Sequence, residues 1–251
     1  MSGVKIKSTR DILIMKEGGR KLAKIKNALA EEVKDGVKAS DIEALATELI
    51  AKSGGQPSFK MVPGYSWSTC VNVNDGLVHG IPTKNIVFKK GDIVSVDVGL
   101  FYGGFHTDTS ISLLIGKDNF KEKFLSVGKH ALRKAIQQVK AGRKIGDISR
   151  VIEKTIEKGG YYPIRALVGH GVGRELHEYP PIACFTTGAR EELIKIENGF
   201  VLAIEVMYAD GGQDVVLDED GWTIRTKNGK ISALFEETVA VTPRGPLVLT
   251  V

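Results

Sequence analysis

Two short apolar runs of the sequence match one another, and each contains a carboxylate. Residues 91–98 (GDIVSVDV) and 199–206 (GFVLAIEV) begin with glycine and place an acidic residue, Asp97 or Glu205, six positions later. An ionised carboxylate inside an apolar strand is costly unless it is paired or binds a metal. Because the chain accepts this cost at two corresponding positions, we predict a site at the centre of a two-fold repeat.

A second carboxylate in each half extends the pattern. Asp108 lies in residues 105–110 (FHTDTS) and Glu236 in residues 234–239 (LFEETV), each just before an apolar strand. If the halves pack face to face, all four carboxylates converge and repel one another strongly. Divalent cations are the natural compensation, and two of them about 3.5–4 Å apart would form a two-metal hydrolytic site.

Three histidines add to this chemistry. His170 lies among glycines (GHGVG), whose small size lets a backbone approach a metal or a substrate. As a fifth ligand, its imidazole would favour Mn²⁺, Fe²⁺, Co²⁺ or Zn²⁺ over Mg²⁺ and Ca²⁺. His79 and His177 could contact a scissile carbonyl or the attacking water, although either alone is more often structural. His106 and His130 give no comparable signal.

Apolar periodicity and turn signals predict the elements that position these side chains. Helices are predicted over residues 8–36, 40–54, 120–142 and 148–159, the second opened by a capping box of Ser40 and Glu43. Strands are predicted over residues 70–74, 108–113, 215–217, 222–225 and 238–241. Residues 103–104 and 227–229 are typical of hairpin turns.

A second pair of matching phrases indicates an ancient duplication. Residues 36–42 (GVKASDI) and 142–148 (GRKIGDI) are 106 positions apart, close to the 108 that separate the two carboxylate runs. We therefore predict one catalytic domain over residues 1–251, with pseudo-symmetric halves of roughly 1–115 and 116–251. The predicted class is α+β, a curved antiparallel sheet covered on its outer face by two helix pairs.

Composition excludes several classes of protein. An apolar fraction of 42% and a charged fraction of 26% are ordinary for a soluble globular chain. No run approaches the roughly 18 apolar residues of a membrane helix, and the first thirty residues lack a signal-peptide segment. Cys70 and Cys184 alone give no disulfide framework, so we expect a cytoplasmic protein. The net charge of +5 is not gathered into a basic block, which argues against specific nucleic-acid binding.

Taken together, the motifs resemble one known family over almost the whole chain. The matching residues are Asn74, 79–82 (HGIP), Asp97, 105–110 (FHTDTS), 169–174 (GHGVGR), 177–178 (HE), 204–207 (IEVM), 220–223 (DGWT) and 236–238 (EET). This set is similar to that of the type I methionine aminopeptidases of family M24, which have the pita-bread fold. The resemblance implies removal of the N-terminal methionine from nascent polypeptides, preferably when the second residue is small.

The resemblance also implies the metal centre. Its five ligands would be Asp97, Asp108, His170, Glu205 and Glu236. They would hold two divalent ions (Co, Mn, Fe, Zn or Ni), with Asp108 and Glu236 bridging both and Asp97 chelating one. A metal-bound hydroxide would attack the first peptide bond, and Glu205 would also shuttle the proton.

The remaining implied roles concern the substrate. His177 would stabilise the developing oxyanion, and His79 would contact the substrate near the scissile amide. The methionine side chain would enter a pocket of Tyr65, Cys70, Leu176 and Trp222, with Phe59 a weaker candidate. Aromatic and sulfur-bearing walls suit a thioether. A monomer is the family expectation, and transient contact with the ribosome is compatible with work on nascent chains.

Three positions depart from the usual family pattern. Val206 replaces a proline and Glu237 a histidine, while Leu176 stands where phenylalanine is common. An acidic residue such as Glu237 could raise cation affinity or point outward into solvent, and it is more typical of the proline-dipeptidase relatives. The alternatives are therefore an X-Pro dipeptidase of the same fold, or a binding protein that kept the fold without catalysis. Chain length disfavours the first, and the full ligand set disfavours the second.

Overall fold

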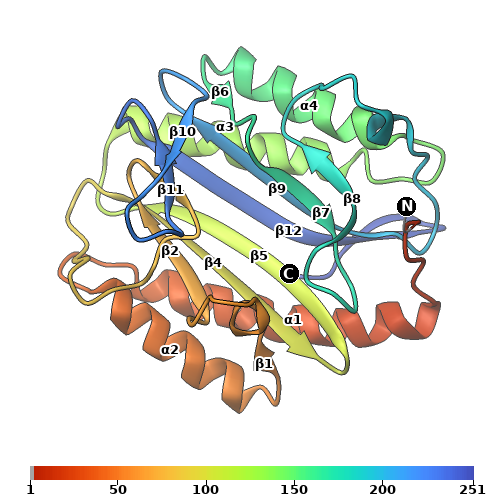
Figure 1. The fold of residues 1–251 in the computed structure, drawn as a ribbon, viewed down its shortest axis with the longest axis horizontal. Coiled ribbons are helices and arrows are strands. Elements are labelled where there is room, and N and C mark those ends of the chain that lie inside the picture. The colour runs from red at the N-terminus through yellow and green to blue at the C-terminus, as the bar shows by residue number, and fades with distance from the viewer. Residues whose placement is uncertain (1–2) are drawn as a thin grey trace.

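The computed structural model describes residues 3–251, and a curved antiparallel sheet forms its centre (Figure 1). In spatial order the strands are β1 (Gln56–Pro57), β4 (Ile93–Tyr102), β5 (Phe105–Leu114), β12 (Ser232–Thr242), β9 (Val201–Ala209), β7 (Val168–Gly171) and β8 (Glu178–Ala183). Beside this path, β2 (Thr69–Val73) pairs with β4, β6 (Tyr162–Pro163) with β9 and β13 (Gly245–Val248) with β12. A smaller sheet has the order β10 (Val215–Leu217), β11 (Ile224–Thr226) and β3 (Gly76–Val78).

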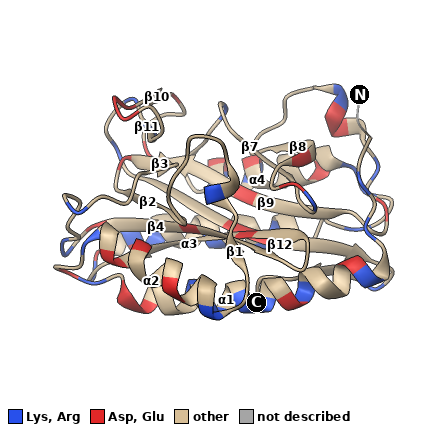
Figure 2. Ribbon diagram, turned by 60° about the horizontal axis from the view of Figure 1, so that its bottom comes forward, with Lys and Arg blue, Asp and Glu red and all other residues tan. Residues whose placement is uncertain are grey.

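Two helix pairs cover the sheet. In the first half, α1 (Thr9–Glu32) and α2 (Ala39–Lys52) bury Leu22 and Ile42 against strand residues such as Val96. In the second half, α3 (Asn119–Ile136) buries Phe124 against β9 and β12, and α4 (Ile145–Lys158) packs on α3 and buries Ile152 in the same apolar cluster. Figure 2 shows α1 and α2 beneath the sheet, with β10 and β11 on its other side. The predicted α+β class, with a curved antiparallel sheet and two helix pairs, is confirmed.

None of the helices in residues 3–251 combines the length and the apolar character that crossing a membrane requires. Two short 3₁₀ turns, Phe59–Met61 and Arg190–Leu193, complete the regular structure.

The repeated phrases 36–42 and 142–148 turn out to be helix starts. The backbone N–H of Lys38 donates to the Asp41 carboxylate (3.1 Å), and the N–H of Lys144 donates to Asp147 (3.0 Å). In each case the aspartate satisfies an amide that the first helical turn leaves unpaired. The predicted capping box of Ser40 and Glu43 is therefore wrong, because α2 already begins at Ala39.

Glu43 has a different task, which the sequence did not indicate. Its carboxylate accepts hydrogen bonds from the backbone N–H groups of Ser68 (2.8 Å) and Thr69 (3.0 Å) and from the Thr69 hydroxyl (2.8 Å). It thus anchors the start of β2 to helix α2.

One predicted turn is confirmed, while several other predicted connections and boundaries differ from the structure. Residues 103–104 form the predicted hairpin turn between β4 and β5. Residues 227–229 also form a turn, but no hairpin follows, because β11 pairs with β10 and β3 while β12 joins the large sheet. Helix α3 ends at Ile136 rather than near Gly142. The strands β5 and β12 extend several residues beyond the segments predicted from alternation.

Helix α3 lies unusually close to the sheet at one glycine. The Tyr208 ring is fully buried between β9 and α3, and its hydroxyl donates to the carbonyl of Phe124 (2.7 Å). A Cβ atom at Gly128 would lie 2.5 Å from Tyr208 Cε1 and 2.6 Å from its hydroxyl oxygen. The absence of a side chain at Gly128 is what allows the tyrosine to fit.

We therefore expect Gly128→Ala to lower the free energy of unfolding by about 1–3 kcal/mol, since an overpacked core must shift backbone or rotamers. Urea denaturation followed by circular dichroism measures this loss. Ser126→Ala, at an exposed position of the same helix, is the control and should change stability by less than about 0.5 kcal/mol. Equal midpoints for Gly128→Ala and the wild-type protein would contradict the close packing.

Candidate active site

Four neighbouring strands place the predicted carboxylates in one row. The register pairs Asp97 of β4 with Ser110 of β5, Ser110 with Glu236 of β12, and Glu236 with Glu205 of β9. Residues directly opposite one another in antiparallel strands point to the same face. Asp108 lies two positions from Ser110 on β5, so it shares that face. All four carboxylates therefore converge on the face of the sheet that the helices leave open.

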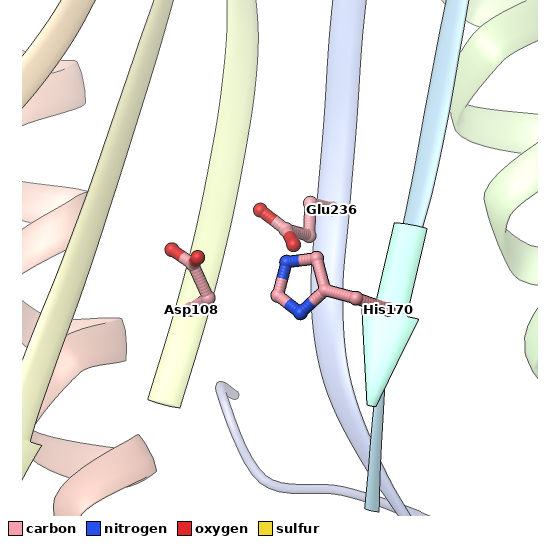
Figure 3. Close-up of side chains that lie close together, drawn as sticks. All are labelled: Asp108, His170 and Glu236. Atoms are coloured by element: carbon pink, nitrogen blue, oxygen red, sulfur yellow. The ribbon is translucent and has the colours of Figure 1, made fainter. Parts of the chain in front are cut away.

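His170 joins the row from β7. It lies opposite Ala203 of β9, two positions before Glu205, and so faces the same side. One ligand atom each of Asp108, His170 and Glu236 lie within 4.8 Å of one another. Figure 3 shows these three side chains pointing toward one another from β5, β7 and β12.

The imidazole of His170 is prepared to act as a ligand. Its Nδ1 lies 2.9 Å from the carbonyl oxygen of Gly171 and donates to it, which leaves the lone pair of Nε2 free. Burial lowers the pKa of His170 to about 3, so the ring is neutral at pH 7. A neutral imidazole held by its second nitrogen is the usual form of a metal-binding histidine.

The donor set fits divalent cations. Among residues 3–251, no lysine or arginine forms an ion pair with Asp97, Asp108, Glu205 or Glu236. The buried atoms Asp97 Oδ1 and Ser110 Oγ have no hydrogen-bond partner. Buried polar atoms in native proteins are normally satisfied, so these two indicate a missing partner. Four carboxylates and one imidazole suit Mn²⁺, Fe²⁺, Co²⁺ or Zn²⁺.

The same crowding shifts the acidity of the carboxyl groups. Burial raises the pKa of Asp108 to about 7. Burial, reinforced by the negative charge of Asp108, raises the pKa of Glu205 to about 8. The pKa values of Asp97 and Glu236 rise well above their usual range for the same two reasons. Without metal, the site therefore retains protons at neutral pH.

A cavity of about 350 Å³ adjoins this row. Its apolar end consists of the buried side chains of Phe59, Tyr65, Cys70 and Leu176, with Trp222 packed against them. The Tyr65 and Trp222 rings meet edge to face, with centroids 5.0 Å apart. The structure thus brings together all four predicted pocket residues and also Phe59.

The pocket and the carboxylate row are joined by strand register. Cys70 of β2 lies directly opposite Asp97 of β4, so the apolar pocket begins beside the last carboxylate of the row. The loop carrying Trp222 is fixed by Asp220, whose carboxylate accepts from the N–H groups of Trp222 (2.8 Å) and Thr223 (2.7 Å). Burial raises the pKa of the Cys70 thiol, which keeps it uncharged.

His79 and His177, the two histidines predicted to contact the substrate, both line the cavity beside the carboxylate row. The rings of His170 and His177 meet edge to face with centroids 4.5 Å apart. His79 directly follows β3 and has a φ of 57°, which is uncommon for a residue other than glycine. Burial, together with the nearby charge of His177, lowers the pKa of His79, so its ring is neutral at pH 7.

Some residues that line the cavity were not among the site residues predicted from the sequence. Met207 lies two positions after Glu205, so strand alternation could have placed it in the cavity. Residues 166–168 approach from the loop before His170, and only the tertiary fold reveals them. His106 is buried but lies outside the cavity lining; its Nδ1 is 2.9 Å from the Ser58 hydroxyl.

Of the three departures from the family pattern, Val206 and Glu237 lie outside the cavity lining and Leu176 lies within it. Glu237 follows Glu236 on β12 and therefore points to the helix-covered face, where its carboxylate accepts from Lys26 (2.6 Å). The outward position in solvent is wrong, because the side chain is mostly buried against Lys26, and an effect of Glu237 on cation affinity stays a prediction. Val206 is buried in the core on that same face. Leu176 lies in the pocket wall and is buried.

Residues 14–243 match the model of metallopeptidase family M24, and the chain belongs to this family. The methionine aminopeptidase of Aquifex aeolicus is 37% identical over 98% of both chains. That of Escherichia coli strain K12 is 32% identical over 98% of this chain and 94% of its own. The solved methionine aminopeptidase of Thermotoga maritima has a TM-score of 0.95 at 40% identity, covering 99% of each chain.

Prolidase structures share the fold alone. The enzyme of Pyrococcus furiosus has a TM-score of 0.78 at 21% identity, over 98% of this chain and 65% of its own.

The raised carboxyl pKa values predict that metal binding releases protons. Asp108 and Glu205, with pKa values of about 7 and 8, must lose their protons to act as ligands, so affinity should rise from pH 6 to pH 8. Titration calorimetry with Co²⁺ in two buffers of different ionisation enthalpy counts the protons released. Heats that do not depend on the buffer would contradict the prediction.

The same shifts set the stability of the metal-free protein. A carboxyl whose pKa is higher in the folded state than in the unfolded state makes folding less favourable once the pH exceeds the unfolded value. Metal-free protein should therefore lose stability as the pH rises from the ordinary carboxyl range to about 8. Added Co²⁺ should remove this loss, as thermal melts at several pH values would show.

Proposed function

We propose that this chain removes the N-terminal methionine from newly made polypeptides in the cytoplasm, by metal-dependent hydrolysis of the first peptide bond. One observation carries the proposal. An apolar pocket with aromatic and sulfur-bearing walls adjoins a row of four carboxylates and a histidine. The pocket suits an unbranched thioether side chain, and the row suits the cations of a peptide hydrolase.

The relatives support the same assignment. Full-length proteins named methionine aminopeptidase are 32–37% identical to this chain. A small second residue is the proposed preference. The X-Pro dipeptidase reading is not favoured, because the prolidase of Pyrococcus furiosus is only 21% identical to this chain and matches in fold alone. A purely binding role is disfavoured by the presence of all five proposed ligands.

Each proposed ligand has a defined place. Asp97, Asp108, His170, Glu205 and Glu236 would hold the cations. Divalent ions bound there would lower the pKa of a water molecule and polarise the scissile carbonyl.

The other side chains of the cavity would bind and orient the substrate. The pocket of Phe59, Tyr65, Cys70, Leu176 and Trp222 would exclude water from around the methionine side chain and fix the first peptide bond over the row. His177 would donate a hydrogen bond to the carbonyl oxygen as it becomes negative. His79 would contact the scissile amide. A carboxylate oxygen of Glu205 would take the proton of the attacking water and give it to the departing amine nitrogen.

The direct test is release of methionine from Met-Ala-Ser with Co²⁺, Mn²⁺, Fe²⁺, Zn²⁺ or Ni²⁺ supplied in turn. We expect release with at least one metal, loss of release on chelation, and much weaker cleavage of Ala-Pro. Circular dichroism shows that the sample is folded. A folded sample that releases no methionine with any of these metals would refute the proposal, and preferential cleavage of Ala-Pro would favour the dipeptidase.

Two variants separate ligand roles from substrate roles. Asp108→Asn should abolish turnover and weaken metal binding, because the proposed bridging carboxylate contacts both ions. His79→Ala should slow turnover by roughly 10²-fold while leaving metal affinity nearly intact, as expected for one lost donor near the reacting carbonyl. Calorimetry with Co²⁺ and the Met-Ala-Ser assay together measure both effects. Wild-type turnover in Asp108→Asn, or a large loss of metal in His79→Ala, would require the roles to be reassigned.

A further inference from the structure

The row of proposed ligands crosses the junction between the two halves of the molecule. Strand β5 belongs to the first half and β12 to the second, and they lie side by side at the centre of the sheet (Figure 1). Their register pairs residues 109–110 with residues 236–237, whereas β12 and β9 pair along almost their whole length. Asp108 and Glu236, the proposed shared ligands, therefore lie on two strands, β5 and β12, that are joined by only a short stretch of backbone pairing.

Side-chain hydroxyl groups extend this short ladder. The Thr238 hydroxyl donates to the carbonyl of Asp108 (2.8 Å) and accepts from its N–H (2.9 Å). The Ser112 hydroxyl likewise donates to the carbonyl of Leu234 (2.8 Å) and accepts from its N–H (3.0 Å). The spacing between β5 and β12 thus depends on side chains as well as on backbone pairing.

One charged group ties the two strands together from the helix-covered face. Lys26 of α1 is buried, and its ammonium donates to the Thr109 hydroxyl of β5 (2.8 Å) and to the Glu237 carboxylate of β12 (2.6 Å). The Thr109 hydroxyl donates in turn to the carbonyl of Glu236 (2.8 Å). The hydroxyl of Thr250 also donates to Glu237. A buried ammonium is therefore held by groups from both halves.

These anchors directly follow the proposed shared ligands along the chain. Thr109 follows Asp108, and Glu237 follows Glu236, so strand alternation sends each anchor to one face and each ligand to the other. A displacement of either anchor must move the neighbouring ligand, because they share a rigid, paired backbone.

We propose that Lys26, through its ion pair with Glu237 and its hydrogen bond to Thr109, is a positioning residue that fixes the separation of Asp108 and Glu236 and thereby sets divalent-metal affinity. This inference rests on the proposed metal site. It assigns a role to a family departure, Glu237, that neither touches the cavity nor faces solvent.

The variant Lys26→Met distinguishes positioning from long-range electrostatics. Loss of the Lys26 ammonium leaves Glu237 as an extra negative charge behind the site. By charge alone, this would tighten cation binding, or leave cation binding unchanged if Glu237 takes up a proton. Positioning predicts the opposite. We expect Co²⁺ affinity to fall by about 10-fold or more, the usual effect of removing a group that orients a ligand.

Thr109→Val supplies a second test that involves no charge and still decides the question if Lys26→Met does not fold. It removes the hydroxyl between Lys26 and Glu236 while keeping the shape of the side chain, and it too should weaken Co²⁺ binding. Ile25→Ala is the matched control, because Ile25 is buried on the same helix and contacts the apolar core instead. That variant should lose stability but keep wild-type metal affinity.

Calorimetry with Co²⁺ on the folded, full-length variants gives the result, and Met-Ala-Ser turnover at saturating Co²⁺ is measured in parallel. Weaker binding in Lys26→Met and Thr109→Val, with Ile25→Ala unchanged, supports the inference. The inference is overturned if Co²⁺ binding in Lys26→Met is unchanged or tighter. If Lys26→Met does not fold, the same result in Thr109→Val overturns it. Equal weakening in Ile25→Ala also overturns it, because the effect would then follow general stability. Failure of the wild-type protein to bind Co²⁺ or release methionine would instead refute the proposed function.

Discussion

The mutual repulsion of four carboxylates in one row of a sheet is the constraint on which the rest of this structure depends. Asp97, Glu236 and Glu205 lie in register across β4, β12 and β9, with Asp108 beside them, and no basic side chain pairs with any of them in residues 3–251. Water would relieve this repulsion, but the fold excludes it from most of the row. The scaffold must therefore hold the row together by packing and hydrogen bonds elsewhere, and protons or bound cations must offset the negative charge.

The recurrence of similar elements accounts for the frame but not for the chemistry. Each half contributes two helices and a pair of long antiparallel strands, and even the aspartates that begin α2 and α4 correspond. A symmetric frame of this kind could trap ions without choosing a substrate. In the proposed site, the unrepeated parts would make the choice: His170 on β7, His79 after β3, and the loop that carries Trp222. Selectivity would then arise where the two halves differ.

The sequence predicted the site better than it predicted the connections. Strand alternation and the paired phrases were enough to place Asp97, Asp108, Glu205 and Glu236 together, since a period of two is a strong geometric rule. Local rules failed where tertiary contacts compete: Glu43 leaves its expected capping role to bind the backbone of β2, and residues 227–229 join strands of different sheets. The partner of Glu237 was unpredictable, because nothing local relates it to a lysine on the first helix.

The ion pair between Lys26 and Glu237 spans 211 positions of the chain. Asp97, Asp108 and Lys26 all precede β12 in the chain, so during synthesis they emerge before Glu236 and Glu237. Neither half contains all five proposed ligands, and the row cannot be completed until the last long strand is added. A protein proposed to trim other chains as they are made would thus have no complete site of its own until its translation is nearly finished.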